Sequence, residues 1–208
     1  MLISMIILGV LTLMIIVGIA KSVLSDLRTN WLIPVIFFVM VIGLNFIPII
    51  RWGGFSFSVG TLLFYLVVFA MFFLFGKLSS QMTAMAIGLI LGGLAYAATR
   101  LALLGGSNFF GTSNFVYALI IGTLAFFITR NGKYSFISSA IAMLLLNLLV
   151  QIGGEISLNY GFDWTMVACG TAFTMHAIIG MITKEMATHS EHNGRRLAHM
   201  FEFGRLDD

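Results

Sequence analysis

The chain has 208 residues, of which 60% are hydrophobic and only 9% are charged, and its mean hydropathy is +1.05. A soluble domain has about 45–50% apolar and about 25% charged residues, so the sequence predicts an integral membrane protein and excludes a disordered chain. The single cysteine excludes a disulfide scaffold, and a net charge of +3 spread thinly along the chain excludes a nucleic-acid-binding protein.

Stretches without charged residues predict the membrane spans, because a bilayer core of about 30 Å needs about 20 apolar helical residues. The stretch from Leu101 to Thr129 is too long for one span and contains the run GGSNFFGTSN, which predicts a loop followed by a helix from Asn114. We therefore expect an all-α protein with seven transmembrane helices, one extra helix followed by three helical hairpins. The expected spans are 1–20, 29–50, 58–76, 78–99, 114–129, 134–154 and 164–183, forming a transmembrane domain over 1–183.

Basic residues in short loops predict the orientation, because they are enriched on the cytoplasmic side of membrane proteins. Only Arg51 and Arg100 fall on one side of the predicted spans, and the other nine basic residues fall on the opposite side. The N-terminus is therefore expected outside and the C-terminus in the cytoplasm. The nine are Lys21, Arg28, Lys77, Arg130, Lys133, Lys184, Arg195, Arg196 and Arg205.

Gly-Gly pairs recur about every 50 residues, at Gly53-Gly54, Gly105-Gly106 and Gly153-Gly154. Each pair stands at the outer end of a predicted helix and precedes a polar, aromatic stretch. The pattern favours an internal repeat of three hairpins whose tips converge on an outward-facing cavity, as in membrane proteins built from repeats. The alternative is that outer loops are glycine-rich without a repeat.

Polar residues beside these tips are the candidates for ligand binding, because ionisable groups near membrane depth are costly and usually functional. Asn147, Gln151 and Glu155 share one face of the sixth predicted span. Two arginines at the other tips would supply donors to a small polar ligand. The predicted ligand-binding residues are Arg51, Arg100, Asn108, Asn147, Gln151, Glu155 and Trp164. The alternative is that the arginines snorkel to the interface and the amides only join helices.

Other polar residues give weaker signals. His176 in the last span is interpreted as hydrogen-bonded packing, with a proton relay as the alternative. Gly88, Gly92, Gly93 and Ala97 predict a small-residue face for close helix contact. The chain has no nucleophile–base pair, P-loop or HExxH motif, so we expect no catalytic residues, no metal site and no cofactor. Any enzymatic activity would lie in a following domain.

Residues 184–208 predict a cytoplasmic amphipathic tail. Leu197, Met200, Phe201 and Leu206 lie roughly on one helical stripe, which predicts a helix that continues the last span and needs a partner. That partner would be a second subunit or a following domain. The ending RLDD predicts that the chain is cut from a longer protein, with a natural terminus as the alternative.

The run from Gly92 to Lys133 resembles the five-transmembrane receptor module of LytS-type sensor histidine kinases. The resemblance rests on Arg100, on Gly105-Gly106, and on the basic turn Arg130-Asn131-Gly132-Lys133. The same module precedes diguanylate cyclase domains in other bacterial proteins, and the terminal RLDD is similar to the lead-in to their catalytic motif.

The resemblance implies a receptor in the bacterial cytoplasmic (inner) membrane that detects a small ligand or envelope signal at its outer face. The last helix would pass the signal to a cytoplasmic kinase or cyclase domain, and a homodimer through helices and tail is the expected assembly. A distant similarity in layout to the substrate-binding subunits of energy-coupling-factor vitamin transporters gives a second hypothesis, a solute-binding transporter subunit. A structural partner of another membrane complex is the third.

Overall fold

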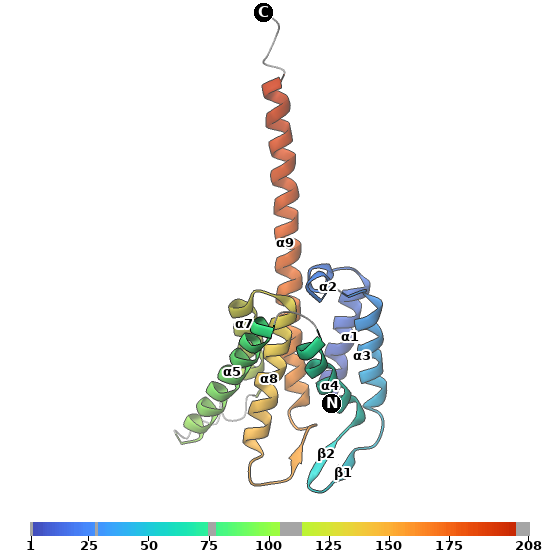
Figure 1. The fold of residues 1–208 in the computed structure, drawn as a ribbon, viewed down its shortest axis with the longest axis vertical. Coiled ribbons are helices and arrows are strands. Elements are labelled where there is room, and N and C mark those ends of the chain that lie inside the picture. The colour runs from blue at the N-terminus through green and yellow to red at the C-terminus, as the bar shows by residue number, and fades with distance from the viewer. Residues whose placement is uncertain (1, 28, 75–77, 105–113, 203–208) are drawn as a thin grey trace, which may run out of the picture.

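A computed structural model describes residues 2–27, 29–74, 78–104 and 114–202 (Figure 1). The described residues are mostly helical, which confirms the predicted helical class, and three short strands among them add a small sheet that the sequence did not predict. The helices are α1 (Leu2–Ile16), α2 (Lys21–Leu27), α3 (Leu32–Leu44), α4 (Val59–Leu74), α5 (Leu78–Leu104), α7 (Asn114–Thr129), α8 (Gly132–Val150) and α9 (Phe162–Glu202). The strands are β1 (Ile50–Trp52), β2 (Phe55–Phe57) and β3 (Ile156–Ser157).

Three of the described helices are long and apolar enough to cross a membrane: Leu78–Leu101, Gly132–Val150 and Phe162–Thr183. Four further apolar helices are shorter, namely Leu2–Ile16, Leu32–Leu44, Val59–Met71 and Asn114–Thr129. Outer helices expose large apolar side chains such as Ile6, Met40 and Ile90. These features indicate a membrane protein, and the seven-span topology stays a prediction.

The helix bundle has two distinct ends (Figure 1). The strands lie at one end, called here the sheet end, and α2 lies at the other, called the exit end because α9 leaves the bundle there. α9 begins at the sheet end, crosses the bundle and continues as one helix, 41 residues long in all. The two ends of the bundle are therefore joined by a single uninterrupted element.

The sheet replaces the C-terminal part of the predicted span 29–50. α3 ends at Leu44, where Asn45 is its C-cap and its backbone N–H bonds the Val41 carbonyl oxygen. β1 and β2 then pair antiparallel around Gly53-Gly54, whose φ values of 54° and 83° meet the need of a tight two-residue turn for positive φ. β3 pairs parallel with β2. The sheet thus joins the segments that follow the first and third Gly-Gly pairs.

Two apolar clusters form the core, and both include residues of α8 and α9. The larger cluster packs α1, α2, α3 and α4 against these two helices, and Phe64, Phe162 and Met166 are among its fully buried side chains. The smaller cluster packs α5 and α7 against their other side, around Ala142 and Ala168. α8 and α9 are therefore the central helices.

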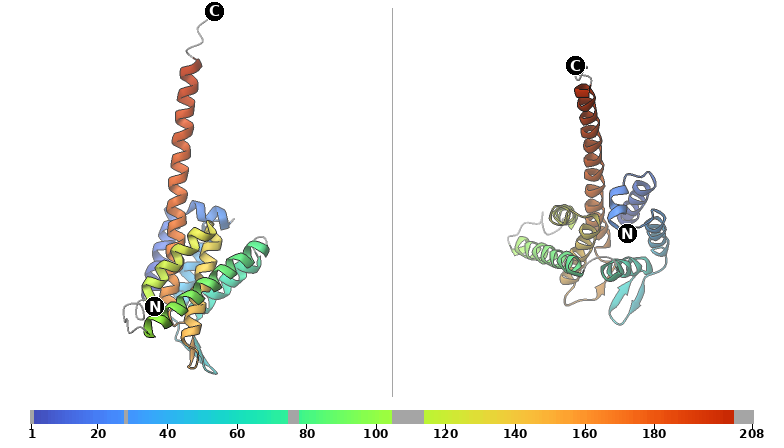
Figure 2. Two further views of the ribbon diagram at one scale, coloured as in Figure 1. Left: turned by 90° about the vertical axis from the view of Figure 1, so that its left-hand side faces the viewer. Right: turned by 45° about the horizontal axis from the view of Figure 1, so that its top comes forward.

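α5 packs slantwise against α8 with very close backbones (Figure 2). A Cβ on Gly92 would lie 2.5 Å from the Ala142 carbonyl oxygen, and one on Gly88 would lie 2.8 Å from that of Ser138. The Ser138 hydroxyl also donates to the Ala84 carbonyl oxygen at 2.8 Å. The small residues Ala84, Gly88 and Gly92 are thus covered by α8 of the same chain.

Candidate functional site

The sheet end holds a network of polar side chains, which includes two of the predicted ligand-binding residues. Its members, called here the sheet-end network, are Asn45, Ser58, Thr61, Tyr65, Asn147, Gln151, Ser157, Asn159 and Thr165. They come from α3, α4, α8, α9 and the segment around β3. The network consists of two hydrogen-bonded groups, which together involve five parts of the chain at the end opposite to the exit of α9. One group is Asn45, Ser58, Thr61 and Asn159, and the other is Tyr65, Asn147, Gln151, Ser157 and Thr165.

Gln151 fixes the segment of β3 to the end of α8. Its amide nitrogen donates to the carbonyl oxygens of Asn147 at 2.9 Å and Ser157 at 3.1 Å, and its Oε1 accepts from the Ser157 backbone N–H at 2.6 Å. Gln151 uses both ends of its amide in these bonds. This residue therefore holds the loop and has little hydrogen-bonding capacity left for a ligand.

α9 enters the same network in its first turn. The Thr165 hydroxyl lies 3.1 Å from the Tyr65 hydroxyl and donates to the Gly161 carbonyl oxygen at 3.2 Å. The Asn147 amide donates weakly to the same threonine at 3.4 Å. Gly161 has φ 69°, and a Cβ there would collide with the Asn147 side chain. Close approach of the α9 start to α8 therefore requires glycine at this position.

The start of α4 forms the other half of the network. The Ser58 hydroxyl donates to Asn45 Oδ1 at 2.5 Å and lies 2.8 Å from the Thr61 hydroxyl, while the Ser58 backbone N–H donates to Asn159 Oδ1 at 2.9 Å. The amide nitrogens of Asn45 and Asn159 are buried and have no hydrogen-bond partner within the described chain. An unpaired buried donor is costly, so these two amides are the least satisfied polar groups of the sheet end.

The charged residues predicted to bind a ligand lie outside this network. Arg51 on β1 and Glu155 before β3 are exposed. Arg100 on α5 is also exposed, and its Nε donates to the Tyr96 hydroxyl at 3.0 Å while its guanidinium lies over that ring. Trp164 packs edge-on against the Phe115 ring.

The structure thus brings together only Asn147 and Gln151 of the predicted set. Asn108 lies outside the described residues. Among residues 2–27, 29–74, 78–104 and 114–202, no described hydrogen bond or ion pair joins Arg51, Arg100 or Glu155 to another member of the set. A ligand site at the outer tips remains a prediction.

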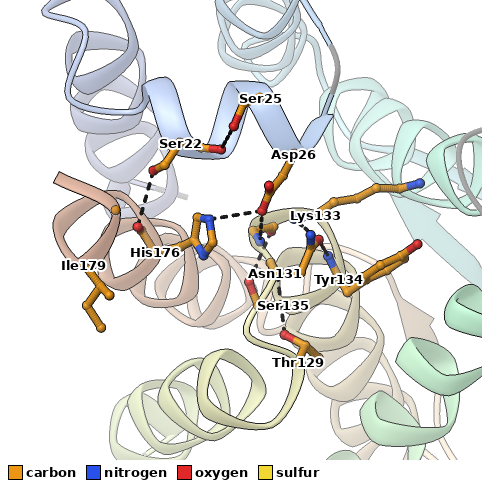
Figure 3. A network of polar contacts seen from close by, with 12 residues as sticks. Ser22, Ser25, Asp26, Thr129, Asn131, Lys133, Tyr134, Ser135, His176 and Ile179 are labelled. Atoms are coloured by element: carbon orange, nitrogen blue, oxygen red, sulfur yellow. Dashed lines mark hydrogen bonds and ion pairs between the residues drawn. The ribbon is translucent and has the colours of Figure 1, made fainter. Parts of the chain in front are cut away.

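The exit end holds a second polar cluster, shown in Figure 3. Asp26 Oδ2 on α2 accepts the Gly132 backbone N–H of α8 at 2.8 Å and lies 3.0 Å from His176 Nε2 on α9. We call these three residues the exit-end junction. The side chains of His176 and Asp26 are 15% and 25% exposed, so the contact is largely shielded and becomes an ion pair when the imidazole is protonated.

The N-cap of α8 and a glycine in its first turn position the residues of the exit-end junction. Asn131 caps α8 by accepting the backbone N–H groups of Lys133 and Tyr134 at 3.1 and 3.2 Å, as an asparagine at an N-cap does. A Cβ on Gly132 would lie 2.9 Å from the His176 ring, so glycine lets α9 approach the start of α8. Ser22 of α2 bonds the His176 carbonyl oxygen at 3.4 Å. Three helices therefore meet within one turn of the point where α9 leaves.

Asp26 is the residue of this junction that sequence reasoning missed. It is the only acidic residue among the first 154. A single acidic residue in this long stretch, together with a histidine in a predicted span, is a signal that the two side chains pair. The interpretation of His176 as hydrogen-bonded packing fits its contact with Asp26, while the alternative of a proton relay stays a prediction.

The part of the chain that the structure describes contains no group of three His, Cys, Asp or Glu side chains that could hold a metal ion. No protein-family model matches the chain, and no curated protein or solved structure is detectably similar to it. The geometry of the two polar clusters and of α9 is therefore the basis for a functional hypothesis.

Proposed function

We propose that the chain is the membrane module of a bacterial sensor, similar in kind to the receptor modules of LytS-type kinases and related diguanylate cyclases. In this proposal it crosses the inner membrane seven times with its N-terminus outside. A small ligand or envelope signal acts at the sheet end, and α9 carries the response to a cytoplasmic output domain. The observation that carries the proposal is α9, one helix from Phe162 to Glu202.

The contacts of α9 support this role. At its start, Thr165 belongs to the sheet-end network, and the Asp163 carboxylate accepts the Ser4 backbone N–H of α1 at 2.9 Å. In its middle, Cys169 and Phe173 are buried in the larger core cluster. At the exit end, His176 contacts Asp26. A displacement of the outer segments would therefore act directly on the helix that leaves the bundle.

The small-residue face of α5 bears on the transporter hypothesis. Ala84, Gly88 and Gly92 would suit docking to a transporter scaffold, but α8 already covers them. The sensor proposal needs no such free face. It needs a central helix that contacts both ends of the bundle.

The proposal is tested with a set of fusions that needs no knowledge of the ligand. The chain is joined after Glu202 to the cytoplasmic core of a well-characterised histidine kinase, with zero to seven helix-forming residues inserted at the junction. If α9 transmits by rotation or displacement, kinase output will rise and fall with the helical repeat of about 3.6 residues.

Asp26→Ala and Ser25→Ala in the most active fusion supply a matched pair, because both residues lie on α2 but only Asp26 contacts α9. We expect the first change to shift basal output and the second to leave it unchanged. Kinase output that depends neither on the insertion length nor on the Asp26→Ala change would contradict the sensor proposal. Removal of residues 184–202 without any loss of function in cells would favour a transporter subunit.

A further inference from the structure

A cavity of about 290 Å³ lies at the exit end, between α3, α4 and the start of α8. This volume is close to the lower end of the range for ligand pockets, roughly 300–1,000 Å³. Phe37, Val67 and Met71 give it an apolar wall, and Thr29 and Lys133 supply its polar groups. None of these residues belongs to the sheet-end network or to the exit-end junction.

The polarity of the cavity changes along the bundle axis. Thr29 precedes α3 and Lys133 stands in the first turn of α8, so both are at the exit end. Phe37 and Val67 lie more than a turn farther toward the middle of their helices. The lining is almost wholly apolar, and its polar residues Thr29 and Lys133 stand at the exit end, which is where the headgroup of an amphiphile would lie with its acyl chain in the cavity.

Lys133 brings a positive charge to the exit end of the cavity. The residue is only 5% exposed, and its ammonium lies 5.4 Å from the centre of the Tyr134 ring. Figure 3 shows the side chain extending away from Asp26. A cation at this depth favours an acidic headgroup over a neutral one.

The rim of the cavity shows from where a ligand would enter. Ile33 lines the cavity and is 62% exposed on the outer side of α3. An apolar residue exposed at this rim is what a lateral opening toward acyl chains requires. The bilayer itself is then the source of the ligand.

We propose that this cavity binds one acyl chain of an anionic phospholipid of the phosphatidylglycerol type, with the phosphate at Lys133 and the chain along Phe37 and Val67. A smaller cavity of about 50 Å³ shares Phe37 and Met71 and reaches Phe173 of α9. Lys133 also follows Gly132, whose N–H bonds Asp26 of the junction. The bound lipid therefore stabilises the packing of α8 and α9 at the exit end, whether or not the protein is a sensor.

The test uses the full chain in nanodiscs of phosphatidylcholine that contain a trace of phosphatidylglycerol with a diazirine in one acyl chain. After illumination, labelled peptides are mapped by mass spectrometry, and unlabelled phosphatidylglycerol, phosphatidylcholine or oleate serves as competitor. We expect labels on α3 and α4, and competition by phosphatidylglycerol alone.

Two matched pairs of variants locate the site. Val67→Phe fills the cavity, whereas Leu66→Phe introduces the same ring on the exposed side of the same helix. We expect at least tenfold weaker labelling for the first and no change for the second. Lys133→Gln should weaken binding about fivefold, which is about 1 kcal/mol at 25 °C. Lys21→Gln, at an exposed lysine of the same end, should have no effect.

Equal labelling of the Val67→Phe and Leu66→Phe variants would show that the lipid does not bind in this cavity. Equal competition by phosphatidylcholine, or equal binding by the two lysine variants, would overturn the preference for an anionic headgroup. Competition by oleate without competition by phosphatidylglycerol would show that a fatty acid is the occupant and would also overturn the proposal. If Val67→Phe fails to fold, as seen by size-exclusion chromatography, the two lysine variants and the competitor lipids still test whether the cavity binds an anionic phospholipid.

Discussion

Adding one methyl group to Gly92 tests how closely α5 packs against α8. A Cβ at this position would lie 2.5 Å from the Ala142 carbonyl oxygen and 3.1 Å from its Cα. Both atoms belong to the backbone of α8, so neither can move by a side-chain rotation. Gly93 is the matched control, because a Cβ there meets nothing within 4 Å.

The magnitude follows from comparing the two substitutions. Both Gly92→Ala and Gly93→Ala gain the helix propensity of alanine over glycine, about 1 kcal/mol, and this gain cancels in the difference. Only the Gly92 variant must separate two helices, and such overpacking costs about 1–3 kcal/mol. We therefore expect its free energy of unfolding to be about 1–3 kcal/mol below that of the Gly93 variant.

Equilibrium unfolding in mixed detergent micelles, followed by tryptophan fluorescence, measures this difference. The Gly93 variant should be as stable as the original chain or slightly more stable. If the two variants unfold at the same detergent fraction, α5 does not approach α8 as closely as described, and the inference that α8 covers the small-residue face is refuted.

Three further changes probe the two polar clusters by the same unfolding measurement. Asp26→Ala removes a charged acceptor from an α8 amide and should lower the free energy of unfolding by about 1.5–3 kcal/mol. Ser25→Ala, at an exposed residue, should change it by less than about 0.5 kcal/mol. Equal effects of the two changes would show that the exit-end junction does not stabilise the fold. Gly161→Ala and Gly153→Ala both strain a backbone with positive φ, but only the first meets a buried asparagine of α8, so it should be less stable by about 1–3 kcal/mol. Tyr65→Phe should cost about 0.5–1.5 kcal/mol through its lost bond to the first turn of α9; no loss would mean that water replaces that bond.

The sequence predicts the helical regions because the bilayer requires long runs of apolar residues, and such runs are visible without knowledge of tertiary contacts. It does not predict the sheet. The strands lie in the stretch between α3 and α4, where Ile47, Ile49 and Ile50 continue the apolar run of the predicted span 29–50 as far as Arg51 and no strand pattern stands apart from that run. Pro48 and Gly53-Gly54 are the signals that interrupt it, and both are local rather than periodic.

The contacts of polar residues are even harder to predict from the sequence than the strands. The spacing of Asn147 and Gln151 correctly places them on one face of a helix, since that depends only on helix geometry. Their partners Ser157 and Thr165 come from other segments, and whether an amide faces a ligand or a neighbouring loop depends on those partners. The pairing of Asp26 with His176 spans 150 residues, and spacing rules do not reach across that distance.

In the proposed sensor, the distribution of polar and apolar contacts along α9 would allow the two ends of the bundle to be coupled. Hydrogen bonds are directional and hold a helix in one rotational setting, and α9 makes them near Thr165 and again at His176. Between these points its contacts with other helices are mainly apolar, through residues such as Phe173, and the Cys169 thiol adds one weak bond to the Phe136 carbonyl oxygen at 3.7 Å. Apolar burial is non-directional, so the middle of the helix offers less resistance to rotation than its ends. A signal that changes bonding at the sheet end would then be opposed mainly at the junction, which makes Asp26 the position where a single substitution should most alter the response.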